Sequence, residues 1–431
     1  MRPRLTPISR VALLGAVLLG TILLAAACAA PATPVEPTSP PLTPVVITTP
    51  TAILTPTPTL EPTATAIPSA TPEPVRIVLP EPGGPYPVGR ALYFMVDERR
   101  GEPHTETAAD VRQLSVEIWY PAQPPPGARP GVYMDPRIAV SFGLPASINE
   151  SLAHAISGPP LAQAEQAFPV LLLNPGFSAL HLEYAALAED LASHGYVVVA
   201  IAHPYVTAAT LLPGNVVAVY GGPEQFEQAW PGRDPFDAEL DDMWVPDTRF
   251  VMDSLAELNA ADPTGRFTGR LDLSQFGLLG HSFGGRTAAA VCQIDTRCTA
   301  ALSMDGGVPG EIIDEGMRVP YLRFAAGDLE PFEIAEARGV FESARADTYL
   351  LTIPGSRHFD FADGYYIAEQ GGAPDLNIRY GTVGSERMIA ITRAYTLAFF
   401  DATLRSTPSP LLEGPSEAFP EVEFEARPAG G

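Results

Sequence analysis

Short apolar runs, separated by polar or amphipathic segments, are the main pattern along the chain. The runs that are apolar at most positions are 168–173, 196–201, 298–304, 319–324 and 348–353. Such runs are typical of strands buried on both faces of a parallel sheet. Between the first two runs, Tyr184, Leu187 and Leu191 recur at helical spacing. This alternation of strand and helix predicts an α/β fold with a mostly parallel, doubly wound sheet.

Several further segments complete the predicted domain. Residues 88–96 and 114–121 are rich in strand-forming residues and predict an antiparallel pair at the edge of the sheet. Helices are expected around 148–156 and over 388–404. The stretch 203–246 interrupts the alternation with these aromatic residues: Tyr205, Phe226, Trp230, Phe236 and Trp244. Inserts after strand ends commonly cover a pocket, so the rings either line a binding site or anchor a long loop.

The amino-terminal part of the chain has a different composition. Arginines in the first ten residues precede an apolar stretch that ends in alanines and Cys28, the pattern of a secretory signal. Residues 1–28 are therefore interpreted as a signal segment with Cys28 lipidated; plain signal cleavage and an uncleaved anchor are the alternatives. Residues 29–75, rich in Pro and Thr, predict a disordered tether. We expect an exported protein, either secreted or held at a membrane by its amino-terminal anchor only.

Length and charge constrain the folded part. Residues 76–410 are enough for one large α/β domain, followed by a carboxyl-terminal tail over 411–431. The sequence holds 26 Lys and Arg against 50 Asp and Glu, a net charge of −24. Such a surface repels nucleic acid and gains nothing from anionic lipid head groups. The composition therefore excludes nucleic-acid partners, and it indicates no oligomeric state.

One hexapeptide carries the strongest chemical signal. Gly-His-Ser-Phe-Gly-Gly occupies 280–285 and follows the apolar run 276–279. It predicts a strand, a sharp turn that exposes Ser282, and a helix whose amino end favours developing negative charge. Glycines flank the serine because neighbouring backbone approaches too closely for a Cβ atom. This is the nucleophile elbow of the α/β-hydrolase fold, and ester cleavage is its leading interpretation.

A base and an acid are expected downstream of Ser282. In this fold the order along the chain is serine, acid, histidine, and His358 is the only histidine after Ser282. His358 is therefore the predicted general base. Asp305 and Asp328 each follow a predicted strand and compete to orient it. The commonest arrangement of the fold favours Asp328, and either carboxylate could instead accept turn hydrogen bonds.

Backbone N–H groups are expected to stabilise an oxyanion in this fold. One donor is Phe283, directly after the nucleophile. The second is expected from an earlier loop that reads Asn-Pro-Gly-Phe at 174–177. Pro175 has no N–H, so Gly176 or Phe177 supplies it.

The remaining cysteines and the absence of metal motifs limit the other chemistry. Cys292 and Cys298 are close in sequence within an exported chain, which predicts a disulfide; free or buried thiols are the alternative. The sequence contains neither a His-Glu-x-x-His motif nor a Cys/His knuckle. We therefore expect no metal and no cofactor.

Six collinear motifs resemble the plasma-type platelet-activating factor acetylhydrolase family and its bacterial relatives. They are Gly-Pro-Tyr-Pro-Val-Gly at 84–89, Trp-Tyr-Pro-Ala at 119–122, Leu-Ala-Ser-His-Gly-Tyr-Val at 191–197, the elbow, Met-Asp-Gly at 304–306, and Gly-Ser-Arg-His-Phe-Asp-Phe-Ala-Asp at 355–363. The resemblance implies that the acid is Asp305, because the family's acid follows the strand next to the nucleophile's. The loop at 174–177 departs from the family's common His-Gly-x-Gly, which puts the acyl preference in question.

The resemblance implies a serine ester hydrolase with Ser282, Asp305 and His358 as its triad. The family cleaves short or oxidised acyl chains from phospholipid-like or simple esters without calcium, so a small-molecule or lipid ester is the expected partner. One alternative is a polyester- or cutinase-like hydrolase of the dienelactone-related branch, with Asp328 as the acid. The other is a tethered binding lipoprotein whose hydrolase fold is inactive.

Overall fold

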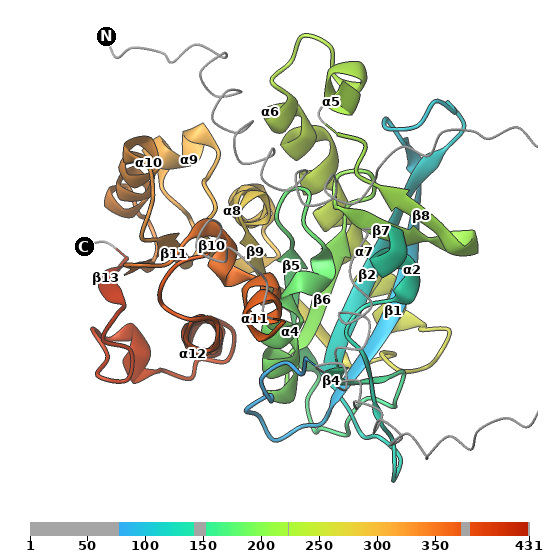
Figure 1. Ribbon diagram of the computed structural model, residues 1–431, viewed down its shortest axis with the longest axis horizontal. Coiled ribbons are helices and arrows are strands. Elements are labelled where there is room, and N and C mark those ends of the chain that lie inside the picture. Colours follow the sequence, from blue (N-terminus) through green and yellow to red (C-terminus); the bar gives the residue numbers. More distant parts are fainter. Residues whose placement is uncertain (1–76, 142–151, 223, 372–379, 430–431) are drawn as a thin grey trace, which may run out of the picture. The chain divides into compact units, whose positions relative to one another are not determined.

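The computed structural model describes residues 77–141, 152–222, 224–371 and 380–429 (Figure 1). The predicted signal segment, Cys28 and the tether 29–75 lie outside the described residues and stay predictions. Within the described ranges, no helix combines the length and apolar character that crossing a bilayer requires.

The centre of the domain is a sheet whose middle strands run parallel (Figure 1). In spatial order these strands are β12 (Thr348–Ile353), β11 (Tyr321–Ala326), β10 (Cys298–Met304), β9 (Leu271–His281), β5 (Phe168–Asn174) and β6 (Val197–Ala202). Beyond β6, strands β2 (Val111–Pro121) and β1 (Val88–Gly101) continue the sheet in antiparallel pairing. The predicted mostly parallel sheet with an antiparallel edge is confirmed.

Short strands at both edges were not predicted. Residues 152–156 of the expected helix 148–156 belong to strand β4 (Leu152–Ser157) instead, while 148–151 lie outside the described residues. β4 pairs with β1 and with β3 (Pro130–Val132), and the Glu189 carboxylate accepts its N–H groups at His154 and Ala155, at 3.1 and 2.9 Å. Pairing with distant strands outweighs the local helical pattern here.

The carboxyl-terminal segment also joins the sheet. Strand β13 (Glu423–Arg427), which follows the short helix η7 (Pro410–Leu412), pairs antiparallel with β12. We therefore propose that the folded domain extends beyond residue 410, through the segment that was expected to be a tail.

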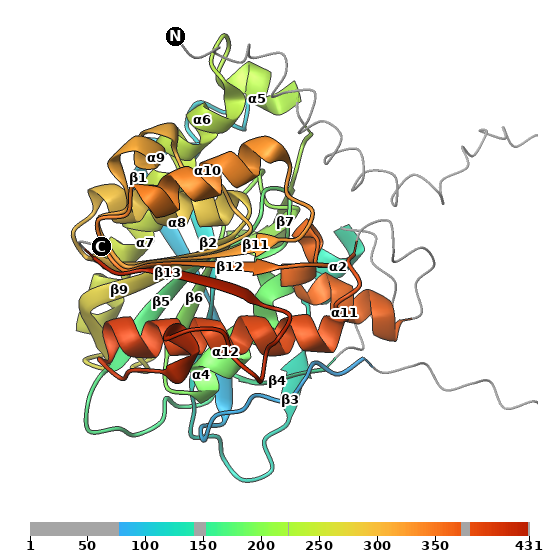
Figure 2. The same ribbon diagram turned by 90° about the vertical axis from the view of Figure 1, so that its left-hand side faces the viewer.

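Helices cover both faces of the sheet (Figure 2). One face packs against α4 (Ala185–Ser193), α11 (Asp363–Gln370) and α12 (Ser385–Leu404). The other packs against α7 (Val245–Ala260) and α8 (Phe283–Ile294), with α9 (Gly310–Glu315) and α10 (Pro331–Glu342) on the same side. Alternate residues of β5 serve the two cores: Leu171 and Leu173 the first, Val170 and Leu172 the second. This is why the strand reads as a continuous apolar run.

The insert between β6 and α7 is folded. It contains the hairpin β7 (Ala209–Leu212) and β8 (Val216–Val219) joined by η3 (Pro213–Asn215), then α5 (Glu224–Ala229), α6 (Pro235–Glu239) and η4 (Leu240–Trp244). The helix α2 (Pro136–Ser141) packs on this hairpin. Tyr205 and Trp230 pack against His104, and the side chain of Phe226 lies outside the described residues.

Cys292 and Cys298 form a disulfide that links the end of α8 to the start of β10, with their Cα atoms 5.0 Å apart. Both side chains are buried.

Candidate active site

Ser282 occupies the sharp turn between β9 and α8. Its φ of 54° and ψ of −121° lie in a region that residues with a side chain rarely adopt, so surrounding contacts must hold the turn. A Cβ atom on Gly280 would lie 2.2 Å from the carbonyl carbon of Gly284, and one on Gly284 would lie 2.1 Å from the carbonyl oxygen of Asn174. This close backbone packing requires glycine on both sides of the serine.

The structure brings Ser282, His358 and Asp305 together at the carboxyl edge of the sheet. His358 opens the short helix η5 (His358–Phe361) after β12, and its Nε2 lies 2.9 Å from Ser282 Oγ. Its Nδ1 lies 2.6 Å from Asp305 Oδ2. Asp305 directly follows β10, with a φ of 51°, and its other carboxylate oxygen accepts the Ala326 N–H at 2.8 Å. The carboxylate is therefore fixed on one side and faces the imidazole on the other.

Asp328 takes a different position. Its carboxylate lies 3.6 Å from Arg357 Nε, and its side chain is 53% exposed, against 3% for Asp305. The structure therefore groups Asp305, and not Asp328, with the imidazole. This is the arrangement that the resemblance implied, and it differs from the one favoured by the commonest topology.

Opposing effects act on the pKa of His358. Burial disfavours the imidazolium and lowers the pKa, whereas the hydrogen bond and the negative charge of Asp305 raise it, and the net shift is upward from 6.5. Glu333 and Asp328 add to the upward shift through their charges. A raised pKa makes the neutral imidazole a stronger acceptor for the Ser282 proton.

The backbone N–H groups that were predicted as oxyanion donors have different surroundings. Phe283 is the first residue of α8, where N–H groups have no partner within the helix. The Gly176 N–H donates to Tyr184 Oη at 3.1 Å, so that group is already engaged. Of the two candidates in the earlier loop we propose Phe177, whose ring packs against that of Phe283.

Aromatic rings surround these donor residues. Phe177 packs against Phe283 and Phe236, with ring centroids 5.7 and 5.1 Å apart. Trp244 is buried, stacks on His203 at 3.8 Å and meets the Phe283 ring edge-on at 4.9 Å. Phe236 therefore lies beside the proposed donor residues, and Trp244 anchors the insert.

Two site residues, Tyr184 and His281, were missed from the sequence. His281 Nδ1 lies 2.9 Å from Tyr184 Oη, and its Nε2 lies 2.7 Å from the carbonyl oxygen of His358. The signal for His281 was its position directly before the nucleophile, where it ends a strand at the edge that holds the site. Tyr184 had been assigned only to the apolar face of a helix.

A second buried polar network lies behind residues 174–177, which we call the oxyanion loop after its proposed role. The side chain of Asn174, the last residue of β5, lies 3.1 Å from His203 Nε2 and 3.0 Å from Thr248 Oγ1. His203 Nδ1 lies 2.9 Å from Asp247, which also accepts a 2.6 Å hydrogen bond from the fully buried Arg112 guanidinium. No local pattern marks this network, because its members come from distant segments. It fixes the end of β5, where the oxyanion loop begins.

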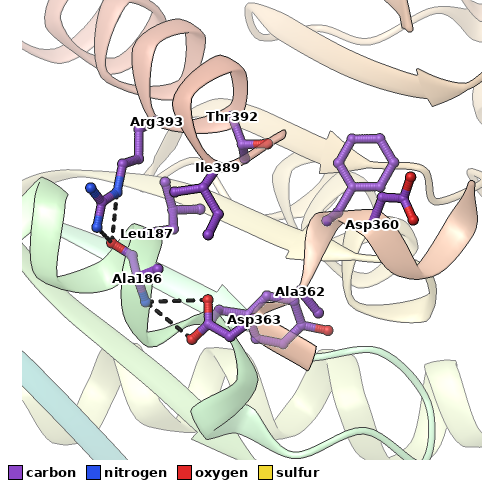
Figure 3. A pocket seen from close by; sticks show the side chains of 10 residues that line it. Ala186, Leu187, Asp360, Ala362, Asp363, Ile389, Thr392 and Arg393 are labelled. Carbon is purple, nitrogen blue, oxygen red and sulfur yellow. Dashed lines mark hydrogen bonds between the residues drawn. The ribbon is translucent and has the colours of Figure 1, made fainter. Parts of the chain in front are cut away.

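The segment that carries His358 is fastened to α4 and α12 around a small cavity (Figure 3). The Asp363 carboxyl accepts the Ala186 N–H at 3.1 Å, and Arg393 donates to the Ala186 carbonyl oxygen at 2.8 Å. Burial raises the pKa of Asp363 to about 8. These contacts hold the start of α4, directly after Tyr184, against the His358 segment.

Comparison with known proteins supports the fold and the class of enzyme. Family models match for the alpha/beta hydrolase fold over residues 169–321 and for platelet-activating factor acetylhydrolase, isoform II, over residues 77–212. A ferulic acid esterase from Streptomyces cinnamoneus has a similar structure, with a TM-score of 0.69 and 29% sequence identity; the match covers 81% of this chain and 99% of that one. The chain is therefore a serine esterase of the α/β-hydrolase fold.

Two known proteins are similar to this chain in sequence. A probable 1-alkyl-2-acetylglycerophosphocholine esterase from Arthroderma benhamiae is 26% identical over 392 residues, which are 81% of this chain and 94% of that protein. The platelet-activating factor acetylhydrolase of Cavia porcellus is 23% identical over 262 residues. The match covers 57% of this chain and 59% of the Cavia porcellus protein, which is less than two thirds of that protein's length. The predicted resemblance is confirmed: this chain is related to the platelet-activating factor acetylhydrolases.

Proposed function

We propose that this chain is an exported serine carboxylic-ester hydrolase of acetylhydrolase type, which removes short acyl groups through an acyl-enzyme on Ser282. The observation that carries the proposal is the contact of 2.9 Å between Ser282 Oγ and His358 Nε2, with Asp305 at 2.6 Å behind the ring. A nucleophile, a base and an orienting acid in this order are what acyl transfer to a serine requires.

The reaction follows from the direction of these hydrogen bonds. His358 Nδ1–H donates to Asp305, which leaves Nε2 to accept the Ser282 proton as Oγ attacks the ester carbon. The Phe283 and Phe177 N–H groups stabilise the resulting oxyanion. As the ester C–O bond breaks, the imidazolium returns its proton to the leaving alcohol. A water molecule then passes a proton to His358 and attacks the acyl-serine. As the bond between the acyl carbon and Oγ breaks, the imidazolium returns that proton to Ser282 and the acid is released.

A short acyl group fits the surroundings of the proposed oxyanion donors. The rings of Phe177, Phe236 and Phe283 pack on one another, with ring centroids no more than 6.1 Å apart. This packing limits the space beside the donors. The names of the acetylhydrolase relatives agree with this preference. Aromatic acyl groups are a second candidate, favoured by the structural likeness to a ferulic acid esterase, because the same rings could stack on a cinnamoyl group.

The place of action is proposed from the amino-terminal segment. The signal-like residues 1–28 with Cys28, and the Pro/Thr-rich tether that follows, suit an enzyme held outside the cytoplasm by a lipid anchor. The Cys292–Cys298 disulfide is consistent with an oxidising compartment.

A series of p-nitrophenyl esters from acetate to palmitate tests the function, with methyl ferulate as an aromatic substrate. We expect the highest kcat/KM on acetate, a steep fall with chain length, and no activity above background in Ser282→Ala. Activity that is equal in wild type and Ser282→Ala would overturn the proposal. A preference for methyl ferulate would favour the second candidate, and no activity on any ester would favour the inactive binding lipoprotein.

A further inference from the structure

Three hydrogen bonds connect the oxyanion loop to the segment that carries the proposed base. The Gly176 N–H lies 3.1 Å from Tyr184 Oη, Tyr184 Oη lies 2.9 Å from His281 Nδ1, and His281 Nε2 lies 2.7 Å from the His358 carbonyl oxygen. We call this connection the Tyr184–His281 bridge. Tyr184 precedes α4, His281 ends β9, and both are at least 97% buried.

The direction of every hydrogen bond in the bridge is determined. The His358 carbonyl oxygen can only accept, so His281 Nε2 carries the ring proton. Burial, with a smaller contribution from His358, lowers the pKa of His281 to about 3, so the ring is neutral and its Nδ1 accepts. Tyr184 therefore donates to Nδ1, and its oxygen accepts the Gly176 N–H. No alternative arrangement of the protons satisfies all of these buried groups.

The bridge is also closely packed. A Cβ atom on Gly176 would lie 3.1 Å from His281 Nδ1 and 3.5 Å from Tyr184 Oη. The rings of His281 and His358 have centroids 4.7 Å apart. These contacts would transmit a displacement at one end of the bridge to the other end.

We propose that Tyr184 and His281 are positioning residues, which hold the oxyanion loop and the His358 segment in the spacing that Ser282 requires. This inference rests on the proposed function and adds a role that acts through Gly176 and His358 rather than on the substrate. Donors that are placed before charge develops contribute most to transition-state stabilisation. A misplacement of about 1 Å can reduce the rate by about 10²-fold.

The first test compares Tyr184→Phe with Tyr120→Phe. Tyr120 is a matched control, because its buried hydroxyl also donates one hydrogen bond, to the Pro159 carbonyl at 2.8 Å, outside the bridge. For each variant we would measure kcat, KM, the fraction of reactive serine titrated by a phosphonate ester, and the melting temperature. In Tyr184→Phe we expect kcat per titrated serine to fall by about 10-fold or more, with KM nearly unchanged. In Tyr120→Phe kcat should stay at the wild-type value, although both variants lose some stability.

A double-mutant cycle is the second test. We expect His281→Leu to lose at least as much kcat as Tyr184→Phe, and the double variant to lose little more than His281→Leu alone, since the two residues act as one unit. If the double variant loses kcat by the product of the two single losses, the proposed coupling between Tyr184 and His281 is wrong. If His281→Leu does not fold, the first test decides alone.

Other outcomes separate this inference from the proposed function. If Ser282→Ala is inactive and Tyr184→Phe matches wild type per titrated serine, only the bridge is wrong. Equal losses of kcat in Tyr184→Phe and Tyr120→Phe would also overturn the bridge, because they would indicate a general effect of stability. If wild type hydrolyses no ester, or Ser282→Ala stays active, the proposed function itself fails.

Discussion

Asp305 and Asp328 differ in their surroundings more than in their sequence context. Both aspartates follow parallel strands, so both carboxylates lie near the edge of the sheet that holds the site. Asp305 turns directly after β10 with a positive φ, which brings its carboxylate to His358 and to the Ala326 N–H. Asp328 comes later in its loop and pairs with Arg357 at the surface. Of these two acids, Asp305 alone contacts the imidazole, and we propose that it orients the ring before substrate arrives.

Exchanging these two acids for asparagine tests the assignment. We expect Asp305→Asn to lower kcat by roughly 10⁴-fold, because the amide favours the wrong tautomer of His358. Asp328→Asn should stay within about threefold of wild type, because its ion pair is exposed and weak. Steady-state kinetics on p-nitrophenyl acetate is the measurement. The opposite order of losses would assign the acid to Asp328.

The pH profile reports the charge around His358. The base must be neutral to accept the serine proton, so activity rises with pH through the pKa of His358, which is raised above 6.5. Asp328 contributes to that upward shift, so Asp328→Asn should move the acidic limb of kcat/KM to lower pH while the plateau stays the same. A limb that does not move, or that moves to higher pH, would contradict this electrostatic account.

Residues were predictable from sequence where a local motif or a fixed chain order marks them. The elbow motif identifies Ser282 as the candidate nucleophile. His358 is the only histidine after Ser282, which identifies it as the candidate base. The choice between Asp305 and Asp328 needed the family resemblance, because both satisfy the same topology. Tyr184 and His281 were not predictable in their roles, since their hydrogen bonds join segments that are distant along the chain.

At the scale of elements, the turn between β9 and α8 determines the site. The turn places the backbone of Gly284 in close contact with the end of β5, where the oxyanion loop begins. This backbone contact sets the distance between Ser282 and that loop. The central strands were predicted well because burial on both faces gives them continuous apolar runs. β13 lies at one edge of the sheet and β4 lies next to the other. Both were missed because pairing with neighbouring strands holds them, and their sequences lack such a run.

Gly284→Ala tests this close approach. Its Cβ would lie 2.1 Å from the Asn174 carbonyl oxygen, so the backbone must shift, and we expect a loss of about 1–3 kcal/mol in stability together with a large loss of activity. Gly310→Ala, at the start of α9, is the control, because its Cβ would meet no atom within 4 Å. Chemical denaturation and ester assays measure both effects. Equal stability and activity in the two variants would contradict the proposed constraint.

At the scale of the whole molecule, charge and anchoring are linked. A net charge of −24 gives the protein no electrostatic attraction to anionic lipid. We therefore propose that any stable association with a membrane comes from the amino-terminal segment. That segment was predicted from composition and from the position of Cys28, and it lies outside the described residues.

Fractionation of cells that express the full chain tests the anchor. We expect wild type in the membrane fraction and Cys28→Ala in the soluble exported fraction, because the substitution removes the site of lipidation while leaving the catalytic domain unchanged. Ester hydrolysis per molecule should be equal in the two. Identical partitioning of wild type and Cys28→Ala would exclude a lipid anchor at this cysteine.

The central claim is that an acyl group passes through the hydroxyl of Ser282. Mass spectrometry of a p-nitrophenyl acetate reaction quenched in acid tests it most directly. We predict one acetyl group on the peptide that contains Ser282, absent in Ser282→Ala and more abundant when deacylation is slowed. Turnover without any adduct on that peptide, or with the adduct on another residue, would contradict the account.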